Sequence, residues 1–302
     1  MAMKVGVIGL GTMGMGAALN LHRKGHEVVG CELREASRGA FVSAGGRAVA
    51  SPADLPADLD AVVVFVINAA QTEQVLFGEG GCLAGLNQGA VVLCCATIAP
   101  EAAKALGPRI EAAGFLMLDA PVSGGKAGAE AGTLTVMAAG SDAAFAKARP
   151  VLDAIAGKVW ALGDQPGVGS TVKMVNQLLA GVHIATAAEA LALGIRAGAD
   201  PQTLYDVISS SAGNSWMWQN RVPHVLAGDD TPLSAVNIFV KDLGIVLDQA
   251  RALTFPLPMA AAAHQLFLAA AAHGEGAKDD VFVIRVWQAL AGIDLPKGSD
   301  SK

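Results

Sequence analysis

The sequence predicts an α/β protein: an N-terminal doubly wound parallel sheet, followed by an all-α C-terminal domain that a long helix joins to it. The first half alternates short apolar runs with helical patterns, which is typical of β-α-β units. Two of these runs, 61–66 (AVVVFV) and 90–93 (AVVL), are unbroken, as in parallel strands that helices cover on both faces. Beyond residue 162 no convincing strand pattern remains, and helical patterns follow one another.

The strand patterns of the first half are short and separated by helical stretches, of which 13–24 is the first. We expect strands at 5–8, 27–32, 61–66, 90–93, 115–119, 134–138 and 158–162, arranged in a right-handed parallel sheet. The pattern changes at the turn-like stretch 163–167 (GDQPG). The N-terminal domain is therefore predicted at residues 1–163.

Residues 164–302 are predicted to form the helical domain. Its first helix, at 168–196, would be over about 40 Å long at a rise of about 1.5 Å per residue. Further helices are predicted at 201–209, 237–252, 258–272 and 279–290. Trp216 and Trp218 lie in a Gly/Ser-rich stretch between them, and either a lid over a pocket or plain packing between helices would explain the pair.

Composition excludes several classes of protein. Of the 302 residues, 53% are hydrophobic and 16% charged, which is incompatible with a disordered chain. The net charge of −6, without a basic stripe, argues against a nucleic-acid partner. The longest uncharged run, 252–274, contains two prolines and two histidines and is mostly Ala, so we expect a buried helix and no membrane partner.

Cysteine usage indicates a reducing compartment. The four cysteines form no C-x-x-C pair and have no metal-type spacing with histidine, so we expect free thiols and no bound metal. His22 and His26 have helical spacing, but Gly25 separates them, and we expect a surface pair. The chain enters its first predicted strand at once, without a signal peptide. A cytoplasmic location is the expectation.

The first strand–helix turn carries the sequence Gly9-Leu-Gly11-Thr-Met-Gly14, a G-x-G-x-x-G motif. In the Rossmann arrangement such glycines permit a tight turn, close approach of a pyrophosphate and close packing of helix on strand. The helix N-terminus supplies amide donors to the phosphates. We therefore expect dinucleotide contacts from Gly9, Gly11, Thr12, Met13 and Gly14. A glycine-rich turn without a ligand is the alternative.

An acidic residue, Glu32, ends the second predicted strand. Its carboxylate would accept hydrogen bonds from the ribose hydroxyls and would repel a 2′-phosphate, which favours NAD over NADP. Arg34, two residues further on, could instead serve a 2′-phosphate. The cofactor prediction is NAD.

Three later stretches complete a recognisable pattern: 119–125 (DAPVSGG), 167–176 (GVGSTVKMVN) and 239–243 (FVKDL). Together with the first turn, they resemble the β-hydroxyacid dehydrogenase family, which includes 3-hydroxyisobutyrate dehydrogenase and tartronate semialdehyde reductase. The resemblance covers about residues 3–290 and extends in detail to the sugar-acid branch of the family. It implies an NAD-dependent oxidoreductase that acts on a small hydroxy acid.

The resemblance assigns the substrate carboxylate to Ser123, Gly124 and Gly125. Successive amides beside a hydroxyl can form an anion-binding concavity, although an ordinary glycine-rich turn would have the same composition. Lys173 lies among apolar residues of the long helix, where partial desolvation disfavours its charged form. The resemblance implies that Lys173 is the general acid/base. A lysine whose ammonium group reaches water is the plainer alternative.

Asn176 shares a helix face with Lys173 and, by the resemblance, holds oxygen groups of the substrate. Family members usually carry Asn at the next position also, whereas this chain has Gln177, which puts the substrate in doubt more than the chemistry. The resemblance places the remaining cofactor contacts at Val66, Ile67, Thr97 and Lys241, with Asp242 as a structural partner. Ile67 replaces the usual proline.

The resemblance implies NAD-dependent oxidation of a four-carbon polyhydroxylated acid such as L-threonate to its 2-oxo acid. The alternatives are 3-hydroxyisobutyrate or tartronate semialdehyde chemistry and, from another class, a non-catalytic dinucleotide-binding module. Retention of Lys173 favours an enzyme. The Ala-rich helical stretches at 180–200 and 259–272 could pack between subunits, so a homo-oligomer, a dimer or tetramer, is expected.

Overall fold

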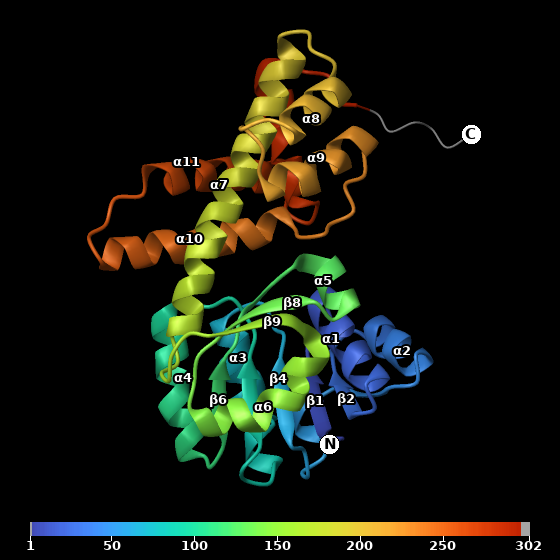
Figure 1. Ribbon diagram of the computed structural model, residues 1–302, viewed down its shortest axis with the longest axis vertical. Helices are drawn as coiled ribbons and strands as arrows, with labels where there is room; N and C mark the ends of the chain where they lie inside the picture. The colour runs from blue at the N-terminus through green and yellow to red at the C-terminus, as the bar shows by residue number, and fades with distance from the viewer. Residues whose placement is uncertain (1, 297–302) are drawn as a thin grey trace. The chain divides into compact units, whose positions relative to one another are not determined.

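The computed structural model describes residues 2–296 and divides the chain into two compact units, Met1–Met174 and Val175–Lys302 (Figure 1). The division falls within a continuous helix, α7 (Val168–Arg196), rather than at residue 163, where the sequence pattern changes. Within residues 2–296, every strand that belongs to a sheet lies in the first unit, and the second unit is built from helices.

The first unit is built on a six-stranded parallel sheet of strand order β3-β2-β1-β4-β5-β6. Every neighbouring pair runs parallel, and the order reverses direction between β1 and β4, so the predicted doubly wound sheet is confirmed. The strand β3 was not expected, because its three half-exposed or exposed residues give no apolar run. The strands are β1 (Lys4–Ile8), β2 (Glu27–Cys31), β3 (Arg47–Val49), β4 (Ala61–Val64), β5 (Val91–Cys94) and β6 (Leu116–Asp119).

A separate three-stranded sheet follows, made of β7 (Val122–Ser123), β8 (Leu134–Ala138) and β9 (Ala156–Ala161). The expectation that 134–138 and 158–162 extend the parallel sheet was wrong. β7 continues in the direction of β6, because Asp119 of β6 and both residues of β7 face β8 in one antiparallel register. The chain reverses only after β7, around α5 (Gly125–Ala131), so β8 runs antiparallel to β7, and β9 then pairs parallel with β8.

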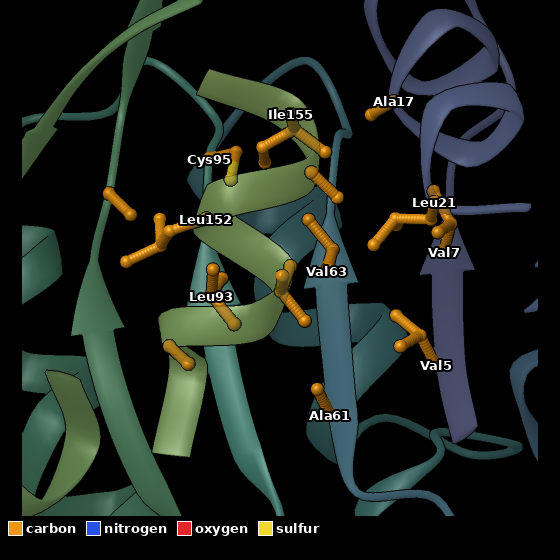
Figure 2. Close-up of a cluster of buried hydrophobic side chains, with 14 of the residues drawn as sticks. Val5, Val7, Ala17, Leu21, Ala61, Val63, Leu93, Cys95, Leu152 and Ile155 are labelled. Carbon is orange, nitrogen blue, oxygen red and sulfur yellow. The ribbon is translucent and has the colours of Figure 1, made fainter. Parts of the chain in front are cut away.

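Helices cover both faces of the six-stranded sheet. Successive residues of β4 alternate between two cores: Val63 belongs to one, and Val62 and Val64 to the other. Figure 2 shows the first core, in which Val63 faces Leu152 and Ile155 of the green helix. This two-sided burial explains the unbroken apolar runs of the sequence. The helices are α1 (Thr12–Arg23), α2 (Glu35–Ser43), α3 (Ala69–Phe77), α4 (Pro100–Ala112), α5 (Gly125–Ala131) and α6 (Asp142–Ile155).

The second unit is helical, as predicted. It contains most of α7, then α8 (Pro201–Ser209), α9 (Trp216–Ala227), α10 (Val236–Ala252), α11 (Pro258–Ala270) and α12 (Arg285–Ala291). α9 was missed because its first turn follows a Gly/Ser-rich stretch; there the hydroxyl of Ser215 caps the helix by accepting the amide of Trp218 at 3.0 Å. Trp218 is buried within this unit, so packing explains it, while Trp216 is exposed and its role as a lid stays a prediction.

Among the helices of residues 2–296, α7 is long and apolar enough to cross a membrane by length and composition alone. The core helix of a globular protein meets the same criteria, and 44% of the most apolar window of α7 is buried. The run 252–274, which was singled out in the sequence, instead forms the turn after α10, then α11 and a short π-helical end. The absence of a membrane partner stays a prediction.

His26 is buried, contrary to the surface pair expected from its spacing with His22. Its Nδ1 accepts a hydrogen bond from the backbone amide of Met3 at 3.2 Å, at the start of the edge where β1 and β2 pair. An imidazole nitrogen can accept only while it is unprotonated. Burial lowers the pKa of His26 from 6.5, because the imidazolium would lose its hydration.

The lowered pKa of His26 predicts a pH-dependent loss of stability. Below pH 6.5 the unfolded chain binds a proton at His26 more readily than the folded state does. The contribution of neutral His26 to the free energy of unfolding is therefore complete above pH 6.5 and is lost as the pH falls through the lower pKa of the folded state. Urea unfolding at a series of pH values from about 7.5 to about 5 should show a shallower decline for His26→Gln than for the unmodified protein. His22→Gln, a control on the same helix end, should keep the original decline; equal slopes in all three would contradict the assignment.

Candidate active site

The chain's own packing requires two of the three glycines in the first turn. Gly9 has φ +92, and a Cβ there would lie 2.4 Å from the carbonyl oxygen of Phe65. A Cβ on Gly14 would lie 1.8 Å from the carbonyl oxygen of Gly9. These glycines let β1 turn directly into α1 beside β4, and they would be needed with or without a ligand.

Gly11 differs, because the protein itself does not require it. The nearest atom to a Cβ at Gly11 would be Nη2 of Arg34, 3.8 Å away, which is an ordinary contact distance. Gly11 caps α1 without a side-chain hydrogen bond, and the first turn, which includes Thr12 and Met13, contains no acidic residue. This arrangement gives backbone amides with room for a phosphate group to approach. Gly11 is therefore the glycine whose presence fits a dinucleotide.

Glu32 lies directly after β2 and faces the glycine turn. Its Oε2 accepts the backbone amide of Leu10 at 3.0 Å, and its Oε1 accepts the backbone amide and Nε of Arg34, each at 3.1 Å. Partial burial opposes ionisation, but the hydrogen bonds and charge of Arg34 outweigh it and hold the pKa of Glu32 below its ordinary value. Glu32, the expected ribose ligand, and Arg34, the possible ligand of a 2′-phosphate, are therefore paired with each other.

The other expected cofactor residues of the first unit follow neighbouring parallel strands. Val66 and Ile67 come after β4, and Thr97 comes after β5, which pairs with β4. Carboxyl ends of parallel strands share one edge of a sheet, so these loops lie at the same edge as the glycine turn. The amide of Ile67 donates to Oε1 of Gln71 at 2.9 Å, a bond that the usual proline could not make.

The stretch Ser123–Gly125 runs from the last residue of β7 to the first residue of α5. Gly124 and Gly125 have φ values of +129 and +59, so both adopt backbone conformations that side chains disfavour. No protein atom lies within 4 Å of where a Cβ on Gly125 would be. Ser123 is half-buried. Gly125 therefore has open space beside its backbone, close to the hydroxyl of Ser123, which fits the expected carboxylate contact.

Asp119, at the end of β6, holds the N-terminus of α7, a role that sequence reasoning missed. Its Oδ2 accepts the amides of Gly167 and Ser170, each at 2.8 Å, and its Oδ1 accepts the Ser170 hydroxyl at 2.7 Å. Burial raises the pKa of Asp119 above its ordinary value, although the bonds from Ser170 and Gly167 oppose the rise. The sequence did contain a signal for this role. Asp119 is an acid at the end of a buried strand, and the long helix α7 is preceded by Gly167, which has no side chain that could cap it.

The close approach of α7 to the sheets is fixed by a glycine. A Cβ on Gly169 would lie 2.4 Å from the carbonyl oxygen of Met137 and 2.7 Å from that of Asp119. Lys173 follows Ser170 by three residues, about one turn of the same helix. Only 6% of Lys173 is exposed, and lysine is almost never buried to that extent without a partner.

The second unit brings Asn176 and Lys241 into one polar network. The amide Nδ2 of Asn176 donates to Oε1 of Gln177 at 2.9 Å, and Nε2 of Gln177 donates to Oδ2 of Asp242 at 2.5 Å. The ammonium group of Lys241 pairs with the other oxygen of Asp242 at 2.5 Å. Asp242 thus pairs directly with Lys241, and Gln177 connects Asp242 to Asn176. The sequence had suggested only that Gln177 alters the shape of the pocket.

Comparison with known proteins identifies the family. Residues 4–163 match the model of the NAD binding domain of 6-phosphogluconate dehydrogenase, and residues 167–287 match that of the NAD-binding segment of NADP-dependent 3-hydroxyisobutyrate dehydrogenase. L-threonate dehydrogenase of Cupriavidus necator is 56% identical over 296 residues, covering 98% of this chain and 99% of that protein. The chain belongs to the 3-hydroxyisobutyrate dehydrogenase-like family of β-hydroxyacid dehydrogenases.

Solved structures of β-hydroxyacid dehydrogenases and related proteins share the fold. A crystal structure of 3-hydroxyisobutyrate dehydrogenase from Salmonella typhimurium is 48% identical, has a TM-score of 0.90, and covers 94% of this chain and 99% of its own. Psf3, in complex with NADP+ and 2-OPP, is 25% identical with a TM-score of 0.86, covering 93% and 99%. This β-hydroxyacid dehydrogenase therefore takes a nicotinamide dinucleotide, and the first unit has the glycine turn and acid that fit one.

Replacing Asp119 tests the anchor of α7. Asp119→Ala leaves the amides of Gly167 and Ser170 and one hydroxyl buried without an acceptor, at a cost of about 1–3 kcal/mol for each unsatisfied group. Urea unfolding should show a larger loss than for Ser141→Ala, which removes a single capping bond from α6 and should cost about 1 kcal/mol. A loss no greater than that of Ser141→Ala would show that Asp119 does not anchor the helix.

Proposed function

We propose that this β-hydroxyacid dehydrogenase oxidises L-threonate to its 2-oxo acid with NAD. One observation carries the proposal: the 56% identity with an L-threonate dehydrogenase extends over 98% of the chain, and so over both units. A relative of the same name from Escherichia coli strain K12 is 50% identical over 97% of the chain. Similarity of this extent includes the glycine turn, the Ser123–Gly125 turn and α7.

We assign the proton transfer to Lys173. Oxidation of the C2 hydroxyl removes a hydride from C2 and a proton from its oxygen; bound NAD supplies the hydride acceptor. The unprotonated amine of Lys173 takes the proton as the C2–O bond becomes a carbonyl. Burial of Lys173 supports this role, because it keeps the amine away from bulk water, as proton exchange with a bound substrate requires.

The remaining residues orient the reactants. The backbone of Gly124 and Gly125, with the hydroxyl of Ser123, supplies donors for the substrate carboxylate, and Gly125 has open space beside it. Asn176 supplies a carboxamide for a hydroxyl group of the acid. Lys241, held by Asp242, would contact the nicotinamide end of the cofactor. The glycine turn and the loops at Val66–Ile67 and Thr97 hold the dinucleotide.

The proposal for NAD rather than NADP rests on Glu32. Its carboxylate is fixed by the amide of Leu10 and would lie beside the adenosine ribose, where it accepts hydroxyl hydrogens and repels a 2′-phosphate. Arg34 pairs with the same carboxylate and offsets part of its charge. The two side chains therefore set the strength of the preference together.

A second candidate substrate is 3-hydroxyisobutyrate, because the Salmonella typhimurium structure of that name is 48% identical. Oxidation of L-threonate, 3-hydroxyisobutyrate and glycerate, and reduction of tartronate semialdehyde, can be compared through NADH absorbance. A preference for 3-hydroxyisobutyrate or tartronate semialdehyde would replace L-threonate in the proposal. A failure to transfer hydride with any of a broad hydroxy-acid panel would favour a non-catalytic dinucleotide-binding module.

We also propose a homo-oligomer, a dimer or tetramer, in the cytoplasm, with residues 1–163 as the NAD-binding domain and 164–302 as the helical one. Exposed apolar side chains where α10 leads into α11, namely Leu253, Phe255 and Met259, support an oligomer. Four buried cysteines, all free, support a reducing compartment. The negative net charge supports the absence of a nucleic-acid partner.

Lys173→Ala tests the proton transfer. Turnover of L-threonate should fall by about 10² or more, the scale of a general acid–base group, while NAD still binds, as measured by fluorescence titration. Lys24→Ala, at an exposed lysine after α1, should leave turnover unchanged. Near-normal turnover in the Lys173 variant would refute the assignment.

The cofactor preference can be tested with a pair of variants. Glu32→Ala removes the acceptor for the ribose hydroxyls, so the ratio of kcat/KM for NAD to that for NADP should fall about tenfold or more. Arg34→Ala leaves the carboxylate without its cation, so the same ratio should rise. An unmodified protein that prefers NADP would overturn the assignment of Glu32.

A further inference from the structure

The network around Gln177 is buried on one side and partly open on the other. Gln177 is 8% exposed and Asp242 is 2% exposed, whereas Asn176 is half-buried. Gln177 bridges α7 and α10 by bonding both Asn176 and Asp242. All of these residues lie in the second unit, so the network forms within one compact body.

The chemistry of Asp242 gives the network a direction. The ammonium group of Lys241 can only donate, and the two oxygens of Asp242 accept from Lys241 on one side and from Gln177 on the other. Gln177 must therefore turn its Nε2 toward Asp242 and its Oε1 toward Asn176. That oxygen also only accepts, so Asn176 must turn its Nδ2 toward it, which leaves Oδ1 as the acceptor of Asn176 on its other side.

A carboxamide held in this way discriminates between ligand groups. An unrestrained Asn can rotate by half a turn about its last bond to meet either a donor or an acceptor. Here that rotation would set Oδ1 of Asn176 against Oε1 of Gln177, two acceptors facing each other. Asn176 therefore presents Oδ1 to a hydroxyl hydrogen, and a ligand without that hydroxyl leaves Oδ1 unpaired.

We propose that Gln177 is a positioning residue that sets substrate specificity: it fixes the carboxamide of Asn176 so that Oδ1 accepts a hydrogen bond from a non-reacting hydroxyl of the acid. The inference deepens the proposed function and rests on it, because it assumes that the substrate binds at Asn176. It selects polyhydroxylated acids over their deoxy analogues. Gln177 itself need not touch the substrate.

A double-mutant cycle tests this role. The variants are Gln177→Leu, Asn176→Ala and the double variant, assayed with L-threonate and with its two deoxy analogues, 2,4-dihydroxybutanoate and 2,3-dihydroxybutanoate. Gln177→Leu should lower kcat/KM for L-threonate about 3- to 10-fold, the scale of one hydrogen bond, mainly through KM. Kinetics with the analogue that lacks the recognised hydroxyl should change less than about twofold.

The cycle separates an effect through Asn176 from a general one. Because Gln177 acts through Asn176, adding Gln177→Leu to Asn176→Ala should change kcat/KM less than about twofold. The KM for NAD should also stay within about twofold, since Asp242 keeps its ion pair with Lys241. A full additional loss in the Asn176→Ala background, an equal loss with all three acids, or a matching rise in the KM for NAD would each overturn the proposal.

Two controls keep the test decisive. Gln202→Leu removes a Gln–Asp hydrogen bond of the same kind, to Asp206 on the exposed surface of α8, and should leave all the kinetics unchanged. If circular dichroism shows that Gln177→Leu does not fold, Gln177→Asn, one methylene shorter and unable to span both partners, takes its place with the same expected ratios. If the unmodified protein does not oxidise L-threonate, the proposed function fails; the same cycle on its best hydroxy acid and the deoxy analogue of that acid then decides the role of Gln177.

Discussion

The buried carboxylate of Asp119 is the constraint on which the proposed chemistry depends. At the carboxyl end of β6 it accepts the amide of Gly167, which directly precedes α7, and the amide and hydroxyl of Ser170 in the first turn of α7. The first amides of a helix have no partners within the helix and carry partial positive charge, so a carboxylate there meets both needs. Lys173 follows within about one turn, and its backbone position relative to the sheet is set by this contact.

The sequence predicts the parts of the fold that depend on repeated patterns. The apolar run 61–66 predicts a doubly covered strand because alternate residues must enter two cores, as Val62 and Val63 do. α7 and α8 begin and end where predicted, since Pro201 and the preceding Asp200 cap mark a helix start plainly. The second sheet was not predictable in the same way. Its pairing depends on where the chain reverses, which is around α5 between β7 and β8, and strand patterns do not encode the direction in which a strand runs.

The sequence and the family resemblance predict the glycine turns and the titratable side chains of the candidate site. They do not predict the hydrogen-bond partners that hold these side chains in place. The glycine turn and Glu32 could be expected from spacing alone. The hydrogen-bond partners of Glu32, Asp119 and Asp242 could not be predicted. Some of these bonds join elements that are far apart along the chain, and others depend on the rotamer that a side chain adopts. Arg34 illustrates this: the sequence left it as a possible phosphate ligand, and the structure pairs it with Glu32. His26 shows the reverse, since its spacing with His22 suggested exposure while the contact with Met3 buries it.

The same device recurs in both units: an acceptor-only carboxylate fixes the direction of the donors around it. Glu32 orders the amide of Leu10, Asp119 orders the start of α7, and Asp279 accepts the amides of Leu233 and Val281. Burying a carboxylate costs free energy, which apolar packing would avoid. An apolar contact, however, does not distinguish a donor from an acceptor, whereas a chain of hydrogen bonds that starts at a carboxylate has only one satisfied arrangement. At Asp242 that chain runs through Gln177 to the carboxamide of Asn176, so a buried charge determines which atom a half-buried side chain presents to its surroundings.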